Sequence, residues 1–246
     1  MPRLSTGVLG FPDFRGFTRA LILWNLVAYF VLLILGVVAK PVAGLLVTYL
    51  ALNPDLVLRH GFIWQLGTYW IIHSGILNTA FELLSIWFLA AFLESTHGAR
   101  WVAEIFFISV LGAGLAALAL AFVAGQGIVL YGCYGGIFGL LIVFGVLYAD
   151  MEFMMFPLPF QIKAKYLVAV YMLIALAMLF SAQRAYAFSQ LGGALAAWLY
   201  IKFAPRRGFA TASSEGWFGL RNRYYRWKRR RAAKKFEVYM RKHRDN

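Results

Sequence analysis

Long apolar runs, separated by short polar stretches, dominate the hydrophobic pattern of this chain. Residues 20–39 form an uncharged run between Arg19 and Lys40, and residues 74–93 form a second run in which Glu82 is the only charged residue. A helix of about 20 apolar residues crosses the hydrocarbon core of a bilayer. The pattern therefore predicts two membrane-spanning helices in the first part of the chain.

The next apolar region, residues 101–149, contains one charge, Glu104. It is too long for a single membrane-spanning helix. Turn-forming glycines at 125–127 and 131–136 divide it into two further spans. The segment 41–70 is less apolar and carries several aromatic residues, so we expect it to be a structured external loop at the membrane interface.

Two short runs, 166–183 and 185–201, complete the pattern as a fifth and a sixth span. The expected fold is all-α, a polytopic bundle of six transmembrane helices. The expected organisation is an N-terminal cytoplasmic segment at 1–19, a membrane domain at 20–203 and a basic cytoplasmic tail at 204–246.

Composition and charge agree with this membrane assignment. Hydrophobic residues make up 62% of the 246 residues and charged residues 14%, which excludes an ordinary soluble domain. The net charge is +14, and from Lys202 onward 15 basic residues stand against three acidic ones. The single cysteine, Cys133, excludes an internal disulfide.

The positive-inside rule favours a topology with both termini in the cytoplasm. The basic residues outside the tail would then lie inside at Arg3, Arg15, Arg19, Arg100, Lys163 and Lys165, and outside only at Lys40, Arg59 and Arg184. The compact six-span form predicts a bacterial inner membrane. For the tail, attraction to anionic lipid is favoured over RNA binding, because basic segments adjoin many membrane spans.

Three polar residues lie inside predicted spans, where such groups are costly and mark candidate sites. Glu82 and Asn78 are four residues apart in the second span, and Gln190 lies in the sixth. Glu82 is expected to be buried and either protonated or hydrogen-bonded, with Tyr134 or Gln190 as partners. Small residues should let spans four and six approach closely. These residues are Gly135, Gly139, Gly192, Gly193, Ala196 and Ala197.

Several of these stretches resemble the rhomboid superfamily of intramembrane serine proteases. They are "HSGILNTAFELLSIWFLAAFLE" in span two, "GCYGGIFGLL" opening span four, "FPLPFQIKAKYLV" before span five and "SQLGGALAAW" in span six. The resemblance covers roughly residues 18 to 203, in matching order. It implies a rhomboid-like helical bundle.

The resemblance also implies that the catalytic positions have changed. The family serine, in a G-x-S-G motif, corresponds to Tyr134, and the span-six histidine that activates it corresponds to Gln190. The span-two residues that help to hold the oxyanion correspond to Asn78 and Glu82. An amide cannot act as a base near neutral pH. A negative charge at the oxyanion position opposes catalysis.

Other motif residues are retained: His73, Gly132, Gly135, Gly139, Gly192 and Gly193. His73 has a mostly structural role in the family. The resemblance therefore implies an inactive member, a pseudoprotease that binds transmembrane segments of client proteins without cleaving them. The alternative is an active serine-type peptidase with non-standard site residues.

Other chemistries are less well supported by the sequence. Cys133 lies one residue from the serine position, which rotates its side chain by about 100° on a helix, and Ser189 has no histidine near it in the sequence. A transporter would need a polar path, but no paired half-helices occur. The histidines, His60, His73, His97 and His243, are scattered, so neither a metal site nor a cofactor is expected.

Overall fold

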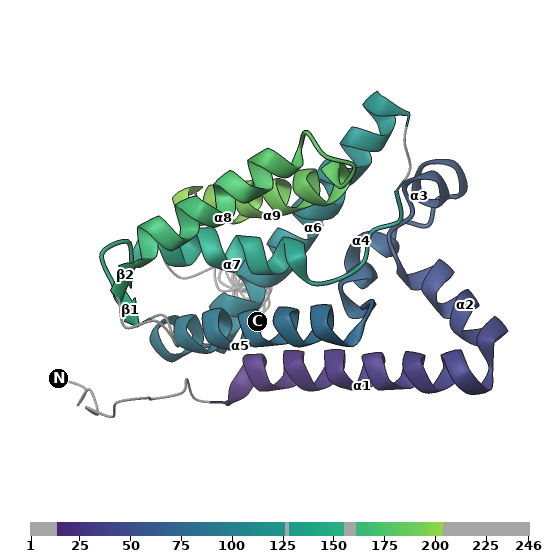
Figure 1. Cartoon of the computed structure of the whole chain (residues 1–246), viewed down its shortest axis with the longest axis horizontal. Coiled ribbons are helices and arrows are strands. Elements are labelled where there is room, and N and C mark those ends of the chain that lie inside the picture. The colour runs from purple at the N-terminus through teal and green to yellow at the C-terminus, as the bar shows by residue number, and fades with distance from the viewer. Residues whose placement is uncertain (1–13, 126–127, 155–160, 204–246) are drawn as a thin grey trace, which may run out of the picture. The chain divides into compact units, whose positions relative to one another are not determined.

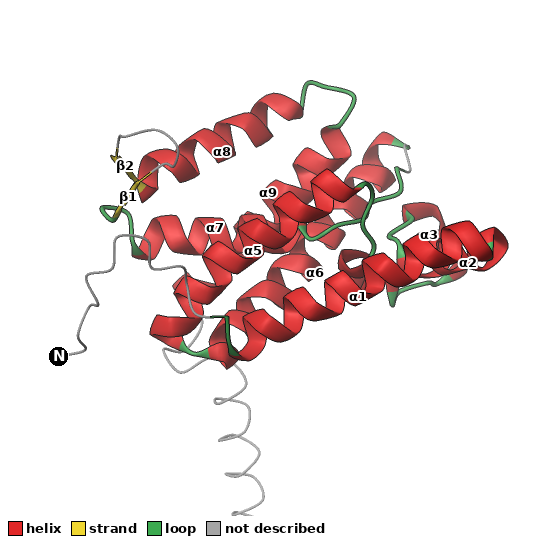
Figure 2. Cartoon of the chain, turned by 60° about the horizontal axis from the view of Figure 1, so that its bottom comes forward, coloured by secondary structure: helices red, strands yellow, loops and turns green. Residues whose placement is uncertain are grey.

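The computed structural model describes residues 14–125, 128–154 and 161–203. The basic tail at 204–246 and most of the N-terminal segment at 1–19 lie outside the described residues. The described part is helical apart from one short hairpin, in agreement with the expected all-α class (Figure 2).

Each of the six predicted spans is a helix. They are α1 (Gly16–Val38), α5 (Ile76–His97), α6 (Ala99–Ala124), α7 (Tyr134–Leu147), α8 (Ala164–Met178) and α9 (Arg184–Phe203). Among the described residues, α1, α5 and α6 are long and apolar enough to cross a membrane, whereas α7 and α8 are apolar but shorter. The protein is therefore an integral membrane protein by its helices, and six crossings stay a prediction.

The expected external loop contains three short α-helices and one 3₁₀ turn. These are α2 (Lys40–Leu50), α3 (Pro54–His60), α4 (Gln65–Thr68) and η1 (Tyr69–Ile71). Buried Gln65 fixes the loop, because its amide nitrogen donates to the carbonyl of Thr48 at 2.8 Å and its amide oxygen accepts the main-chain N–H of Asn53 at 2.9 Å. Leu52 also pairs with Leu130 in an isolated bridge, which holds the loop against the segment before α7.

The helices α6, α7 and α9 pack closely, and α1 runs alongside α5 (Figure 1). Small residues allow the close packing. A β-carbon added to Gly193 on α9 would overlap the main-chain carbonyl of Gly135 on α7, and one added to Gly139 would overlap Ser109 on α6. The predicted approach of spans four and six is confirmed, and α6 shares in it through Gly112, which faces Ala196.

Two acidic residues stabilise helix ends. Glu94, near the end of α5, accepts the main-chain N–H groups of Phe17 and Thr18 at 2.9 and 2.8 Å and the Thr18 hydroxyl at 2.6 Å. It therefore satisfies donors that the first turn of α1 would leave without partners. Glu104 on α6 accepts the Tyr200 hydroxyl of α9 and lies 3.5 Å from the Arg100 guanidinium.

The connection from α7 to α8 is an antiparallel hairpin of β1 (Glu152–Met154) and β2 (Gln161–Lys163). At its base the Lys165 ammonium donates to the Asp150 carboxylate at 2.7 Å. This hydrogen bond lowers the pKa of the exposed Asp150 carboxyl.

Candidate functional site

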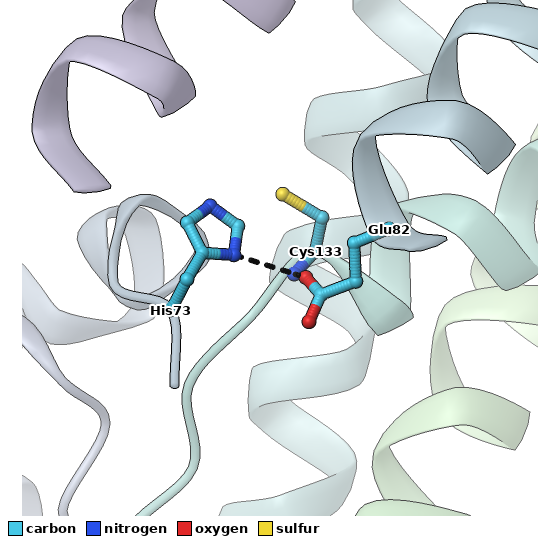
Figure 3. Close-up of side chains that lie close together, drawn as sticks. All are labelled: His73, Glu82 and Cys133. Carbon is cyan, nitrogen blue, oxygen red and sulfur yellow. Dashed lines mark hydrogen bonds and ion pairs between the residues drawn. The ribbon is translucent and has the colours of Figure 1, made fainter. Parts of the chain in front are cut away.

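Polar side chains from four segments lie close together near the start of α7. Asn25 comes from α1, His73 from the loop before α5, Glu82 from α5 itself, and Cys133 from the residue that precedes α7. All four residues are buried. Figure 3 shows the imidazole, the carboxylate and the thiol converging on one point from different segments.

Glu82 is the centre of this group. Its Oε2 atom accepts the main-chain N–H of Cys133 at 2.6 Å and lies 3.2 Å from Nδ1 of His73. The phenol of Tyr134 interacts with the same carboxylate. The prediction that Glu82 is buried and hydrogen-bonded is therefore confirmed, with Tyr134 among its neighbours and His73 as a partner that the sequence did not indicate.

The imidazole of His73 is held from both sides. Its Nε2 atom lies 2.8 Å from Oδ1 of Asn25, and the Asn25 amide nitrogen donates to the carbonyl of Leu21 at 2.7 Å. The thiol of Cys133 donates to the carbonyl of Trp70 at 3.1 Å. Each residue of the buried group thus has at least one hydrogen-bond partner, as is expected when polar groups leave water.

Gly132 is required by the geometry of the turn before α7. Its φ of 95° lies in the region that L-residues with a β-carbon rarely adopt. A β-carbon at this position would also lie 2.9 Å from both carboxylate oxygens of Glu82. The glycine therefore lets the main chain approach Glu82 closely enough for the Cys133 N–H to reach it.

Aromatic rings surround the position that corresponds to the family serine. Tyr134 is half-buried, and its ring meets the edge of the Tyr186 ring with centroids 6.4 Å apart. Tyr131 packs against Tyr186 in the same manner at 6.1 Å. Tyr186 lies one helical turn before Gln190 on α9. Three phenol rings thus lie together beside the start of α7.

Two of the predicted site residues do not join the buried cluster by any hydrogen bond of the described residues. Gln190 is buried on α9, and its Oε1 atom has no hydrogen-bond partner within the described part of the chain. Asn78 is exposed, although its spacing of four residues from the buried Glu82 places both on one face of an ideal helix. Residues four apart are offset by about 40° around a helix, and Ile76 and Leu77 in the first turn of α5 are exposed beside Asn78.

Sequence reasoning missed both the grouping of possible metal ligands and the role of Asn25. His73, Glu82 and Cys133 place ligand atoms within 4.8 Å of one another, although they lie in separate stretches of the sequence. The sequence gives no metal-binding motif, because the histidines are scattered, so the grouping is seen only in the structure. Asn25 could have been noticed, because it is the only side-chain amide in the run 20–39 and amides inside spans seek partners.

The apolar helices and the similarity to a rhomboid-like protein define an integral membrane protein related to the rhomboid superfamily. Residues 24–224 match the family described as eukaryotic integral membrane protein (DUF1751), and the chain belongs to this family. The chain is also similar to Rhomboid-like protein 19 of Arabidopsis thaliana, with 28% identity over 171 residues. That alignment covers 65% of this chain and 54% of the relative, so the chain spans about half of the relative's length.

The family description corrects the expected location. Because the family is eukaryotic, it argues against the bacterial inner membrane that the compact six-span form suggested. Residence in a membrane itself is confirmed by the family and by the apolar helices.

Proposed function

We propose that this protein is a rhomboid pseudoprotease that binds transmembrane segments of client proteins without cleaving them. The observation that carries the proposal is the hydrogen bond from the Cys133 main-chain N–H to the Glu82 carboxylate at 2.6 Å. Main-chain N–H groups beside the nucleophile are the donors that stabilise the oxyanion in acyl transfer. In this chain a carboxylate of the protein already occupies such a donor.

The neighbouring positions support the same proposal. The nucleophile position holds Tyr134, a phenol packed against Tyr186, and the base position holds Gln190, an amide. The only histidine of the buried cluster, His73, is held between Glu82 and Asn25 and is not directed at a hydroxyl nucleophile. Nucleophile, base and oxyanion donor are therefore all unsuited to peptide hydrolysis.

Client binding would use the lipid-facing surface of the bundle. Phe81, Leu84 and Phe88 on α5 are between 47% and 67% exposed, and α8 exposes Val170, Leu173 and Ile174 to a similar degree. In a bilayer, close packing of an apolar client helix against such a surface is the main source of affinity, because lipid is as apolar as the helices.

The experiment is photocrosslinking in native membranes from a photoreactive residue placed at Phe88 or Val170. The matched control position is Trp24 on α1, which is 70% exposed. We expect uncleaved client proteins, crosslinked through their transmembrane segments, from Phe88 or Val170 and not from Trp24. Crosslinks to lipid alone at all three positions, or recovery of clients as cut fragments, would contradict the proposal.

The orientation and the tail belong to the same proposal. With both termini cytoplasmic in a eukaryotic membrane, the 15 basic residues from Lys202 onward face an anionic leaflet. Cysteines introduced at Ser5 and Ser214 in a Cys133→Ala background should react with an impermeant maleimide only after the cytoplasmic face is opened. The tail should bind vesicles that contain phosphatidylserine in a salt-sensitive manner, and preference for RNA over such vesicles would contradict this assignment.

A further inference from the structure

The buried group of His73, Glu82 and Cys133 contains more chemistry than the loss of protease activity requires. Its members are between 0% and 8% exposed, and each offers a metal-ligating atom. Among the described residues, it is the one group of three or more His, Cys, Asp or Glu side chains that could hold a metal ion. Aliphatic side chains could fill the same space without burying polar atoms. Core packing alone therefore does not explain these three residues.

The hydrogen bonds indicate which ring nitrogen of His73 carries a hydrogen. The Asn25 amide nitrogen donates to the Leu21 carbonyl, so Oδ1 of Asn25 is the atom that faces Nε2 of His73 at 2.8 Å. An amide oxygen only accepts, so Nε2 carries a hydrogen. Nδ1 is then the ring nitrogen that faces Oε2 of Glu82, at 3.2 Å.

We infer that this group is a zinc site, with His73 Nδ1, Glu82 Oε2 and Cys133 Sγ as protein ligands and water as the fourth ligand. Zinc binds nitrogen, sulfur and carboxylate oxygen at about 2.0–2.3 Å. Tetrahedral geometry then places ligand atoms about 3.3–3.8 Å from one another. The three ligand atoms lie within 4.8 Å of one another, so small side-chain movements complete the site (Figure 3).

Asn25 has the place of a positioning residue in this site. Histidines that bind a metal through one ring nitrogen usually donate the other N–H to an oxygen, which fixes the tautomer and the orientation of the ring. The contact from Nε2 of His73 to Oδ1 of Asn25 is of this kind, and it leaves Nδ1 directed at the carboxylate. The ligand set and its supporting oxygen are therefore both present in the fold.

The charges balance when zinc binds. The ion displaces the thiol proton of Cys133, and any proton held between Nδ1 of His73 and Glu82, and these protons leave to solvent. One thiolate and one carboxylate then neutralise the two charges of Zn²⁺. The occupied site is therefore neutral, which avoids the cost of a net charge buried within a membrane protein.

The first test is metal analysis of the full-length protein, purified in detergent after incubation with excess zinc chloride and desalting. We expect about one zinc per chain, lost in Cys133→Ser and in Glu82→Gln. His97→Ala, which removes a histidine outside the cluster, should keep its zinc. Less than about one tenth of a zinc per chain in the parent, or unchanged zinc in Cys133→Ser, would overturn the inference.

The second test uses cobalt and does not depend on the yield of bound zinc. Protein reconstituted with Co²⁺ should show a thiolate-to-cobalt charge-transfer absorption band that is absent from Cys133→Ser. Asn25→Ala should weaken zinc affinity by about 10- to 100-fold in competition with a chelating indicator, the usual effect of removing a histidine's supporting partner. No charge-transfer band in a parent that eluted as a single monodisperse species would overturn the inference. Neither test measures proteolysis or client binding, so its result is independent of the proposed function.

Discussion

The carboxylate of Glu82 accepts the main-chain N–H of Cys133 at 2.6 Å and so joins the middle of α5 to the first residue before α7. The same carboxylate lies 3.2 Å from His73, which in turn contacts Asn25 on α1. Side chains of the protein thus hold together four segments: α1, the loop before α5, α5 and the start of α7. The Glu82 carboxylate thus binds groups of the candidate site from within the protein.

Two substitutions of Glu82 should distinguish how much its size and its hydrogen bonds each contribute to stability. Glu82→Gln keeps an oxygen for the Cys133 N–H, so we expect a small change in the free energy of unfolding. Glu82→Leu leaves the N–H of Cys133 and Nδ1 of His73 without a partner, and should destabilise by about 1–3 kcal/mol. The measurement is thermal unfolding in detergent, with exposed Leu84→Ala as control. Equal stability of Glu82→Leu and the parent would show that the hydrogen bond is not important for the fold.

Restoring the two catalytic residue types should not restore catalysis. Tyr134→Ser with Gln190→His returns a serine and a histidine, but Glu82 still occupies the N–H of Cys133. In a studied serine protease, loss of one oxyanion donor lowers the rate about a hundred- to a thousandfold. We expect no measurable cleavage of a transmembrane rhomboid substrate in liposomes. Turnover at the level of an active rhomboid would mean that Glu82 does not obstruct the site.

Glycines at the contact between α7 and α9 should be sensitive to the smallest side chain. A methyl group at Gly193 overlaps the main-chain carbonyl of Gly135, which cannot move without moving α7. We expect Gly193→Ala to destabilise by about 1–3 kcal/mol, as overpacked cores do. Gly44→Ala is the matched control, because no heavy atom lies within 4 Å of its added methyl group. The control should be neutral or stabilising, since alanine favours a helix by up to about 1 kcal/mol.

The position of the membrane helices could be predicted from the sequence because burial in lipid requires long apolar runs. Each of the six predicted runs is a helix, and the turn glycines Gly125 and Gly132 fall where the chain leaves the helical conformation, both with positive φ. The shared helix face of Gly135 and Gly139 on α7 could also be predicted, because residues four apart lie on one face of a helix. The number of membrane crossings could not be predicted, because α7 and α8 are shorter than a usual span.

The buried cluster could be predicted only in part. Glu82 stands out, because it is a carboxylate inside an apolar run. Its contacts with His73 and with the main chain of Cys133 depend on how the loop before α5 folds back, and no local pattern specifies that path. Asn25 was overlooked because a single amide in an uncharged run does not change the span assignment. Asn78 was misplaced because spacing by four does not determine which turn of a helix is covered by its neighbours.

Glu94 should anchor the start of α1 to the end of α5. Its carboxylate accepts three hydrogen bonds from Phe17 and Thr18, in the place of a helix cap. Glu94→Ala should destabilise by about 1–2 kcal/mol, within the range for lost caps. Amide hydrogen exchange at Phe17 and Thr18 should increase, with Ser95→Ala as control. Unchanged exchange at these two amides would show that α1 does not depend on this contact.

The most direct test of the central claim is reaction of the purified parent protein with a fluorophosphonate probe, followed by incubation with a fluorogenic transmembrane rhomboid substrate in liposomes. An active rhomboid serves as the positive control in the same lipid. The account predicts no probe labelling and no cleavage, because Tyr134, Gln190 and the occupied N–H of Cys133 provide neither nucleophile, base nor oxyanion donor. Stoichiometric labelling that disappears on mutation of one serine, such as Ser189→Ala, together with substrate cleavage, would contradict it.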